Sequence, residues 1–296
     1  MSLGSVNKLR QEASAAVAEA VAAVGEYVQH QPVVGMDETS FIQGNSDGKN
    51  SQHIKGWLWV LVTPLISYFQ VWLSRSQAVA QSLLGYDFKG ILTSDRYGAY
   101  NWLEVAQRQI CWAHLKRDFI QIAERAGASA ELGAALLEQQ KHLFALWYQV
   151  RDGTLSRPDL LAAVVPIRAR VYELLHAAAS AELTPQEKTP WAKTVRTCRQ
   201  LLQLEPAMWL FITVEGVEPT NNAAERAIRP AVLWRRTSFG AQSQAGSVFV
   251  ARMLTVVTTL HSQNRNVLEY LSQACQAARE GKSAPSLLPD SSGCKG

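Results

Sequence analysis

The chain has 296 residues, 47% of them hydrophobic and 18% charged, which is the composition of a folded protein with a sizeable core. Its formal net charge of +4 is only mildly basic, so the total charge is weak evidence for a nucleic-acid partner. The longest apolar stretch, residues 57–72, is interrupted by Pro64, Ser67 and Gln70, and is too short and too polar for a membrane span. The N-terminus lacks the pattern of a signal peptide, so we expect a cytoplasmic protein without membrane segments.

The N-terminal segment predicts one amphipathic helix over residues 5–30, because apolar residues recur there at three- and four-residue steps. Pro32 is expected to stop it. We therefore take residues 1–31 as an N-terminal helix, which serves either as a docking helix or as the end of a longer coiled segment.

Residues 32–112 predict strands interrupted by helices. Two β-rich runs, residues 57–63 and 65–73, are joined at Pro64 and indicate a hairpin. The predicted order is three strands, a helix, a strand, a helix and a strand, which favours a mixed sheet covered by helices. The other predicted elements are strands over 33–37, 90–94 and 108–111, a helix over 76–84 stopped by Gly85, and a short helix over 97–104.

The rest of the chain is predicted to be helical. Residues 113–212 carry successive helical patterns, with helices over 159–179 and 190–204. Further helices are expected over 222–229, 244–263 and 266–280. The tail, residues 281–296, is rich in Ser, Pro and Gly and is expected to be disordered. The four cysteines are widely spaced, which fits a reducing compartment and indicates no zinc or redox motif.

Three acidic residues are the candidates for chemistry. Asp37 and Asp95 each end an apolar run, and Glu225 lies in a polar, arginine-rich segment. In an open sheet, ligands gather at the carboxyl ends of strands. If the two strands are neighbours, their carboxylates converge and can hold Mg²⁺, a cation that prefers hard oxygen ligands. A pair of such ions can hold the attacking and the leaving oxygen of a phosphodiester.

Each acid also has a purely structural explanation. Asp37 could open a turn after its strand, and Asp95 could cap the helix predicted over 97–104. Asn222 with Glu225 three residues later has the spacing of a capping box. Taken one at a time, these structural explanations are the simpler ones; the combination of the three acids with the strand order favours the metal site.

Four segments, in this order, resemble the insertion sequence 66-type transposase family across roughly residues 30–280. They are Gly35–Thr39, Thr93–Tyr100, Cys111–Phe119 and Asn221–Arg229, and the last two are the more specific. The resemblance implies an α/β fold: a ribonuclease H-like mixed sheet flanked by helices, with a large all-helical insertion before the last catalytic residue. It also implies the division of the chain into an N-terminal helix 1–31, a first core part 32–112, a helical insertion 113–212, a second core part with C-terminal helices 213–280, and a tail 281–296.

The same resemblance implies an Asp-Asp-Glu triad of Asp37, Asp95 and Glu225, which are both the catalytic residues and the ligands of two Mg²⁺ ions, with Mn²⁺ as a substitute. The activity implied is that of a DNA transposase, which cleaves and transfers strands by phosphodiester transesterification. The implied partners are double-stranded DNA of the element ends and the target, further copies of the chain, and accessory proteins of the same element.

Two alternatives to this activity stay open. One is a metal-dependent nuclease of the same fold, which cuts strands and never joins them. The other is a non-catalytic DNA-binding remnant. Relatives usually carry a longer N-terminal region, with a cysteine-rich zinc-binding part and a helix-turn-helix-like part, and we do not expect those parts in this chain.

Five further residues are candidates for contacts with phosphate or DNA. His114 is predicted at a helix start, where it either contacts the scissile phosphate or orients water, or is a partly buried histidine bonded to backbone. Arg229 lies four residues after Glu225 and so shares its helix face. Arg235, Arg236 and Lys55 suit contacts with the DNA backbone, and for each of them a solvated surface charge is an equal alternative.

Overall fold

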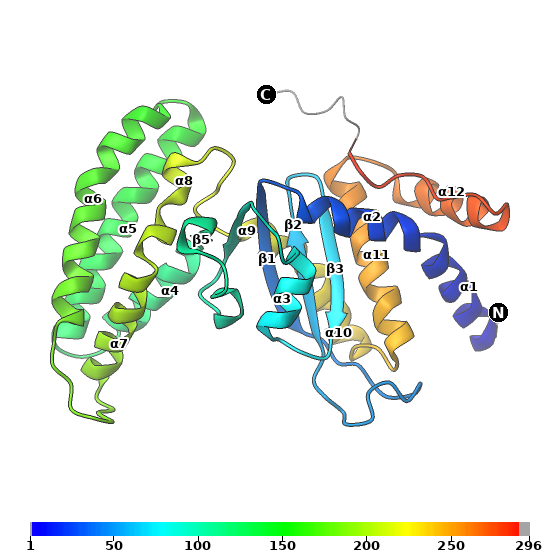
Figure 1. Ribbon diagram of the computed structural model, residues 1–296, viewed down its shortest axis with the longest axis horizontal. Coiled ribbons are helices and arrows are strands. Elements are labelled where there is room, and N and C mark those ends of the chain that lie inside the picture. The colour runs from blue at the N-terminus through cyan, green and yellow to red at the C-terminus, as the bar shows by residue number, and fades with distance from the viewer. Residues whose placement is uncertain (1, 290–296) are drawn as a thin grey trace. The chain divides into compact units, whose positions relative to one another are not determined.

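The structure, a computed structural model, describes residues 2–289 of the chain. It divides into two compact units (Figure 1). Of the described residues, the first unit comprises 2–92, 97–102 and 221–289, and the second comprises 93–96 and 103–220. No helix within residues 2–289 combines the length and the hydrophobicity needed to cross a lipid bilayer.

The strands form a five-stranded sheet in the order β3-β2-β1-β4-β5. β1 pairs antiparallel with β2, and β2 pairs antiparallel with β3, with Trp57 opposite Trp72. The hairpin predicted at Pro64 is therefore confirmed, as is the mixed α/β architecture. The strands are β1 (Val33–Ser40), β2 (Trp57–Val62), β3 (Ser67–Trp72), β4 (Ile91–Ser94) and β5 (Arg108–Ile110).

β1 is longer than predicted. It continues past Asp37 to Ser40, because residues 38–40 pair with Trp59, Leu58 and Trp57 of β2. Asp37 therefore lies inside a strand, and the prediction that it opens a turn was wrong. The polar side chains of residues 38–40 conceal this extension in the sequence.

The helix predicted over residues 5–30 is two helices, α1 (Leu3–Ala16) and α2 (Ala18–Gln29). They meet at Val17, which is fully buried. The two helices share one partner and differ in the others: both contact α11, whereas α1 also contacts α12 and α2 also contacts α3 and β3. A single straight helix could not cover both sets of partners, and sequence periodicity does not reveal such a break.

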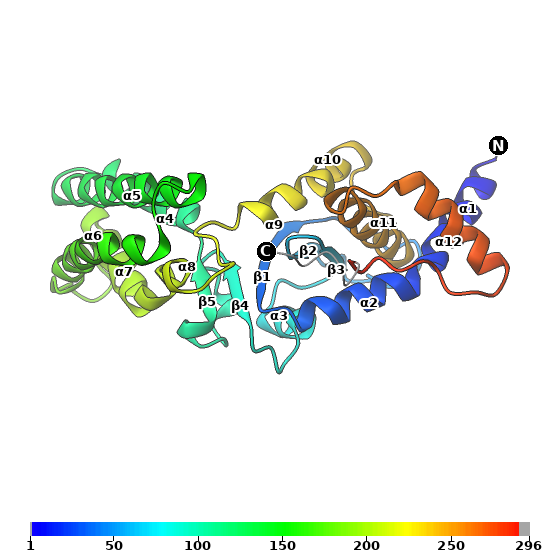
Figure 2. The ribbon, with the colours of Figure 1, turned by 90° about the horizontal axis from the view of Figure 1, so that it is seen from above.

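Helices cover both faces of the β1–β3 meander in the first unit (Figure 2). On one face lie α2 and α3 (Gln77–Leu84), where Gly25 allows α2 to approach the ring of Tyr68: a Cβ on Gly25 would lie 2.8 Å from that ring. On the other face lie α9 (Asn222–Ala227), α10 (Arg229–Ser238) and α11 (Gln244–Ser262). Their small residues, such as Ala224 and Ala231, share a core with Leu58, Val60 and Phe69.

The helix predicted over residues 97–104 was wrong. The segment forms one short 3₁₀ turn, Gly98–Tyr100, and a second one, Val105–Gln107, follows it. Two side-chain hydrogen bonds explain the irregular path: Tyr97 Oη donates to the carbonyl oxygen of Arg75 at 2.7 Å, and Tyr100 Oη donates to Glu38 at 2.5 Å.

The C-terminal part of the first unit consists of α12 (Val267–Arg279) and the segment that follows it. Tyr270 Oη donates to the carbonyl of Pro285, and Gln263 Nε2 donates to the carbonyl of Leu287, both at 2.8 Å. Leu287 is buried. Residues 281–289 thus pack on helices, which differs from the expectation of a disordered tail; residues 290–296 lie outside the described part of the chain.

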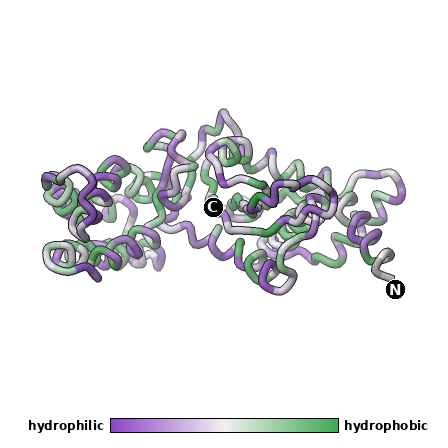
Figure 3. The backbone as a smooth tube through the Cα atoms, turned by 90° about the horizontal axis from the view of Figure 1, so that it is seen from below, coloured by the Kyte–Doolittle hydropathy of each residue, from purple (hydrophilic) through white to green (hydrophobic). Residues whose placement is uncertain are grey.

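The second unit is dominated by helices, and along them hydrophilic and hydrophobic residues alternate, as amphipathic helices around a shared core require (Figure 3). Side-chain caps begin two of them: Ser156 accepts from the Asp159 amide and Thr189 from the Ala192 amide. The helices are α4 (Trp112–Ala123), α5 (Ala128–Asp152), α6 (Arg157–Ala179), α7 (Pro190–Gln203) and α8 (Leu210–Thr213).

Candidate functional site

Asp37 lies in the middle of β1, and the alternation of the strand decides which way its side chain points. Val34, Met36 and Glu38 are buried on one face. Gly35 and Thr39 are on the other, because Gly35 lies against α9 and Thr39 accepts a hydrogen bond from α10. Since side chains alternate between faces, Asp37 is on the α9 and α10 face. It is half-buried, and its Oδ1 accepts the amide of Glu38 at 2.9 Å.

Asn221 seats the start of α9 against β1. Its Nδ2 donates to the carbonyl oxygen of Met36 at 2.7 Å, and the residue is buried. Gly35 makes this approach possible, because a Cβ there would lie 2.7 Å from Asn221 Oδ1 and 2.8 Å from a methyl of Val62. The helix is thereby held beside the residue that precedes Asp37.

Glu225 lies in the first turn of α9 and is half-buried. The capping-box interpretation of Asn222 with Glu225 was wrong, because α9 begins at Asn222 and its N-cap is Asn221, which makes no side-chain capping bond. The structure therefore brings Asp37 and Glu225 onto directly adjoining elements of the first unit, β1 and α9.

Glu38, the acid next to Asp37, has a different environment on the opposite face of β1. Its carboxylate pairs with Arg75 at 2.5 Å and accepts the Tyr100 hydroxyl, and its side chain is only 1% exposed. The Arg75 guanidinium in turn lies 3.8 Å from the ring centroid of Tyr97. This buried network assigns Glu38 a structural role, and no sequence signal links these four residues.

Asp95 belongs to the second unit and directly follows β4, which is the neighbour of β1 in the strand order. It is half-buried. Because the helix expected over 97–104 does not form, Asp95 is not the N-cap of that helix. The next residue, Arg96, is paired with Asp118 at 2.8 Å.

The basic candidates fall into two groups. Arg235 is structural in part: its Nη1 donates to Thr39 Oγ1 and to the carbonyl of Ser40, which ties α10 to the end of β1. Arg229, Arg236 and Lys55 are exposed, and the Lys55 ammonium lies 4.6 Å from the ring centroid of Trp57.

His114 belongs to the second unit. It lies in the first turn of α4 and is half-buried, and its backbone amide donates to the carbonyl of Cys111 at 3.0 Å.

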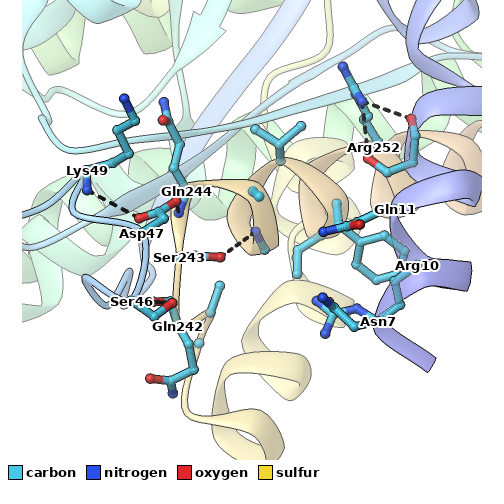
Figure 4. Close-up of a pocket in the computed structure, with 18 of the residues that line it drawn as sticks. Asn7, Arg10, Gln11, Ser46, Asp47, Lys49, Gln242, Ser243, Gln244 and Arg252 are labelled. Atoms are coloured by element: carbon cyan, nitrogen blue, oxygen red, sulfur yellow. Dashed lines mark hydrogen bonds between the residues drawn. The ribbon is translucent and has the colours of Figure 1, made fainter. Parts of the chain in front are cut away.

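A separate cleft of about 1100 Å³ lies on the first unit between α1, the loop at residues 46–49, and the loop that leads into α11 (Figure 4). Sequence reasoning did not find it, because its walls come from segments about 200 positions apart. Its charged residues are Arg10, Asp47, Lys49 and Arg252.

Comparison with known proteins places these features in a family. Residues 2–248 match the family model described as "Transposase IS66 family". Two curated relatives from Sinorhizobium fredii strain NGR234, the uncharacterized proteins y4qI and y4hP, are 29% and 27% identical to the chain. These matches cover 77% and 66% of this chain but only 44% and 38% of the relatives, so the chain spans less than half of their length. No solved structure matches. Because the family model covers most of its length, the chain belongs to the IS66 family of transposases.

Proposed function

We propose that this chain carries the catalytic core of a DNA transposase that cleaves element ends and transfers the cut strand to target DNA. The observation that carries the proposal is the placement of Asp37 and Glu225, two acids of the family-matched region, on adjoining elements β1 and α9. The order of the strands, an antiparallel meander joined to two further strands reached through helical segments, supports a ribonuclease H-like core.

The donor set fits Mg²⁺. Asp37, Asp95 and Glu225 offer carboxylate oxygens, which are hard ligands, and all three are half-buried, so a bound ion would stay in reach of water and phosphate. Bound there, Mg²⁺ or Mn²⁺ would supply charge stabilisation at the phosphate and a more acidic water. The fully paired Glu38 does not fit this role, because its oxygens already meet Arg75 and Tyr100.

In this proposal the three carboxylates would hold the divalent cations, whose positive charge would bind the scissile phosphate between the attacking and the leaving oxygen. In the first step a water oxygen bonds to phosphorus, the bond from phosphorus to the 3′ oxygen breaks, and a 3′-hydroxyl is released. In the second step that hydroxyl bonds to a phosphorus of target DNA and another 3′ oxygen leaves. Asn221 positions Glu225 by tying α9 to β1, and the exposed Arg229 is available to the DNA backbone.

The test is nicking of supercoiled plasmid by the purified chain in Mg²⁺ or Mn²⁺. We expect Asp37→Asn, Asp95→Asn and Glu225→Gln each to lower the nicking rate at least about 100-fold. Each change removes a carboxylate ligand of the cation, and charge stabilisation by such a cation in the transition state is worth several kcal/mol. Asp87→Asn is the matched control, because Asp87 is an exposed acid of the first unit, and it should nick at the unaltered rate.

Two results would count against the assignment. If any one of the three variants nicks as fast as the unaltered chain, that residue is not a ligand. If cutting occurs but oligonucleotides with pre-cleaved ends are never joined to a plasmid, the chain is a nuclease and the transfer step is wrong.

A further inference from the structure

Phe239 has an unusual combination of exposure and backbone conformation. It follows the last residue of α10, the residue is 74% exposed, and its φ is +56°. Bulky side chains rarely adopt this left-handed region, and such conformations persist only where neighbouring structure holds them. Packing within the first unit does not account for the residue type, because most of the ring faces solvent.

The loop that carries Phe239, residues 239–243 between α10 and α11, is held by hydrogen bonds. Gly240 follows with a φ of +95°, and a Cβ there would lie 2.2 Å from the carbonyl oxygen of Ile42. Figure 4 shows the later part of this loop beside residues 46–49. The anchoring hydrogen bonds are Ala241 N to Ile42 O, Gly44 N to Ala241 O, Ser46 Oγ to Gln242 O and Gln244 N to Asp47 Oδ2, all between 2.7 and 2.9 Å.

Exposed apolar residues and exposed arginines lie on α10, which precedes Phe239, and on the segment that pairs with its loop. Ile42 and Leu233 are each 62% exposed. Between Glu225 and Glu269 the chain has six arginines and no acidic residue, and two of them, Arg229 and Arg236, are exposed on α10. An acid-free stretch of this kind suits a polyanion.

We propose that Phe239 is a wedge that inserts between base pairs of duplex DNA while the arginines of α10 contact the phosphates on either side. Rigidly presented apolar side chains are used in this way to unstack a base step and bend the duplex. The inference rests on the proposed function, since it assumes that DNA lies along α9 and α10. Fourteen residues separate Phe239 from Glu225 along α9 and α10, which at the helical rise corresponds to about 21 Å, or about six base pairs.

A second copy of this chain is a poorer occupant of the same surface. A two-fold symmetric contact places the same patch of each copy against the other, and here it would bring Arg236 and its neighbours onto their own counterparts. Duplex DNA complements this charge and offers apolar base steps to the ring.

The experiment uses the full chain and two 30-base-pair duplexes that carry 2-aminopurine, one at a central TA step and one within an A-tract, in EDTA so that no strand is cut. TA steps unstack easily and A-tracts are stiff. We expect binding to raise the fluorescence at the TA step at least threefold. Phe239→Ala should abolish this rise and weaken DNA binding less than tenfold, whereas Phe239→Trp should keep at least half of it. Leu268→Ala, which removes an equally exposed apolar side chain from α12, should change nothing.

Three results would overturn the proposal, and they are distinguishable. If the chain binds the duplexes but Phe239→Ala keeps the full rise, or Leu268→Ala loses it as well, the wedge is wrong and the catalytic proposal stands. If Phe239→Ala instead dissociates an oligomer with DNA binding unchanged, the surface is a protein contact. If the unaltered chain binds neither duplex, the proposed function fails together with the wedge.

Discussion

At the scale of single residues, two adjacent acids in β1 have opposite roles because strand alternation sends them to opposite faces. Glu38 is buried and paired with Arg75, whereas Asp37 shares a face with α9. The sequence motif predicted Asp37 as the candidate but could not exclude Glu38, because the partner Arg75 lies 37 positions away in a loop without a signature. The buried amide of Asn221 was equally unrecognised as a structural contact.

The hydrogen bond of Asn221 yields a prediction for stability and activity together. Asn221→Ala leaves the buried carbonyl of Met36 without this donor, which should cost about 1–3 kcal/mol in the free energy of urea unfolding. The nicking rate should fall as well, although the three acids are intact, because α9 loses its tie to β1. Asn222→Ala, at the exposed neighbouring position, is the control and should change the unfolding free energy by less than about 0.5 kcal/mol. Equal losses for both variants would refute the positioning role.

At the scale of elements, local signals predicted those parts of the fold that depend on neighbouring residues. The hairpin at Pro64, the end of α3 at Gly85 and the start of α7 at Pro190 follow from turn and cap chemistry. The break between α1 and α2 and the folding of residues 281–289 onto α12 depend on distant partners. The composition and periodicity of the sequence do not reveal those partners.

Tyr270 tests the packing of residues 281–289 on α12. Burial raises the pKa of its phenol from 10.0 to about 12, and the hydroxyl donates to the Pro285 carbonyl. A folded pKa above the unfolded one means that the stabilisation is fully present below pH 10 and is lost as the pH rises toward 12. Between these two pH values the unaltered chain should therefore lose more unfolding free energy than Tyr270→Phe, as measured by urea titration. Parallel losses in both chains would show that residues 281–289 do not bury this phenol in solution.

At the scale of the whole molecule, the predicted mixed sheet and the long helical region are present. The units do not follow the chain in simple order. Residues 93–96 belong with the helical unit, and residues 97–102 return to the first. Asp95 therefore lies in one unit and Asp37 and Glu225 in the other. The predicted division into continuous segments, such as 32–112, could not show this. That the three acids form one site is our proposal, and the family match supports it.

The central claim is that these three carboxylates together bind a pair of divalent cations. The most direct measurement is anomalous diffraction from crystals soaked in Mn²⁺, with the manganese positions located independently of the protein. The account predicts two peaks about 3.5–4 Å apart, ligated by Asp37, Asp95 and Glu225. Manganese bound elsewhere, with the three carboxylates too far apart to bind the same two metal ions, would contradict the claim.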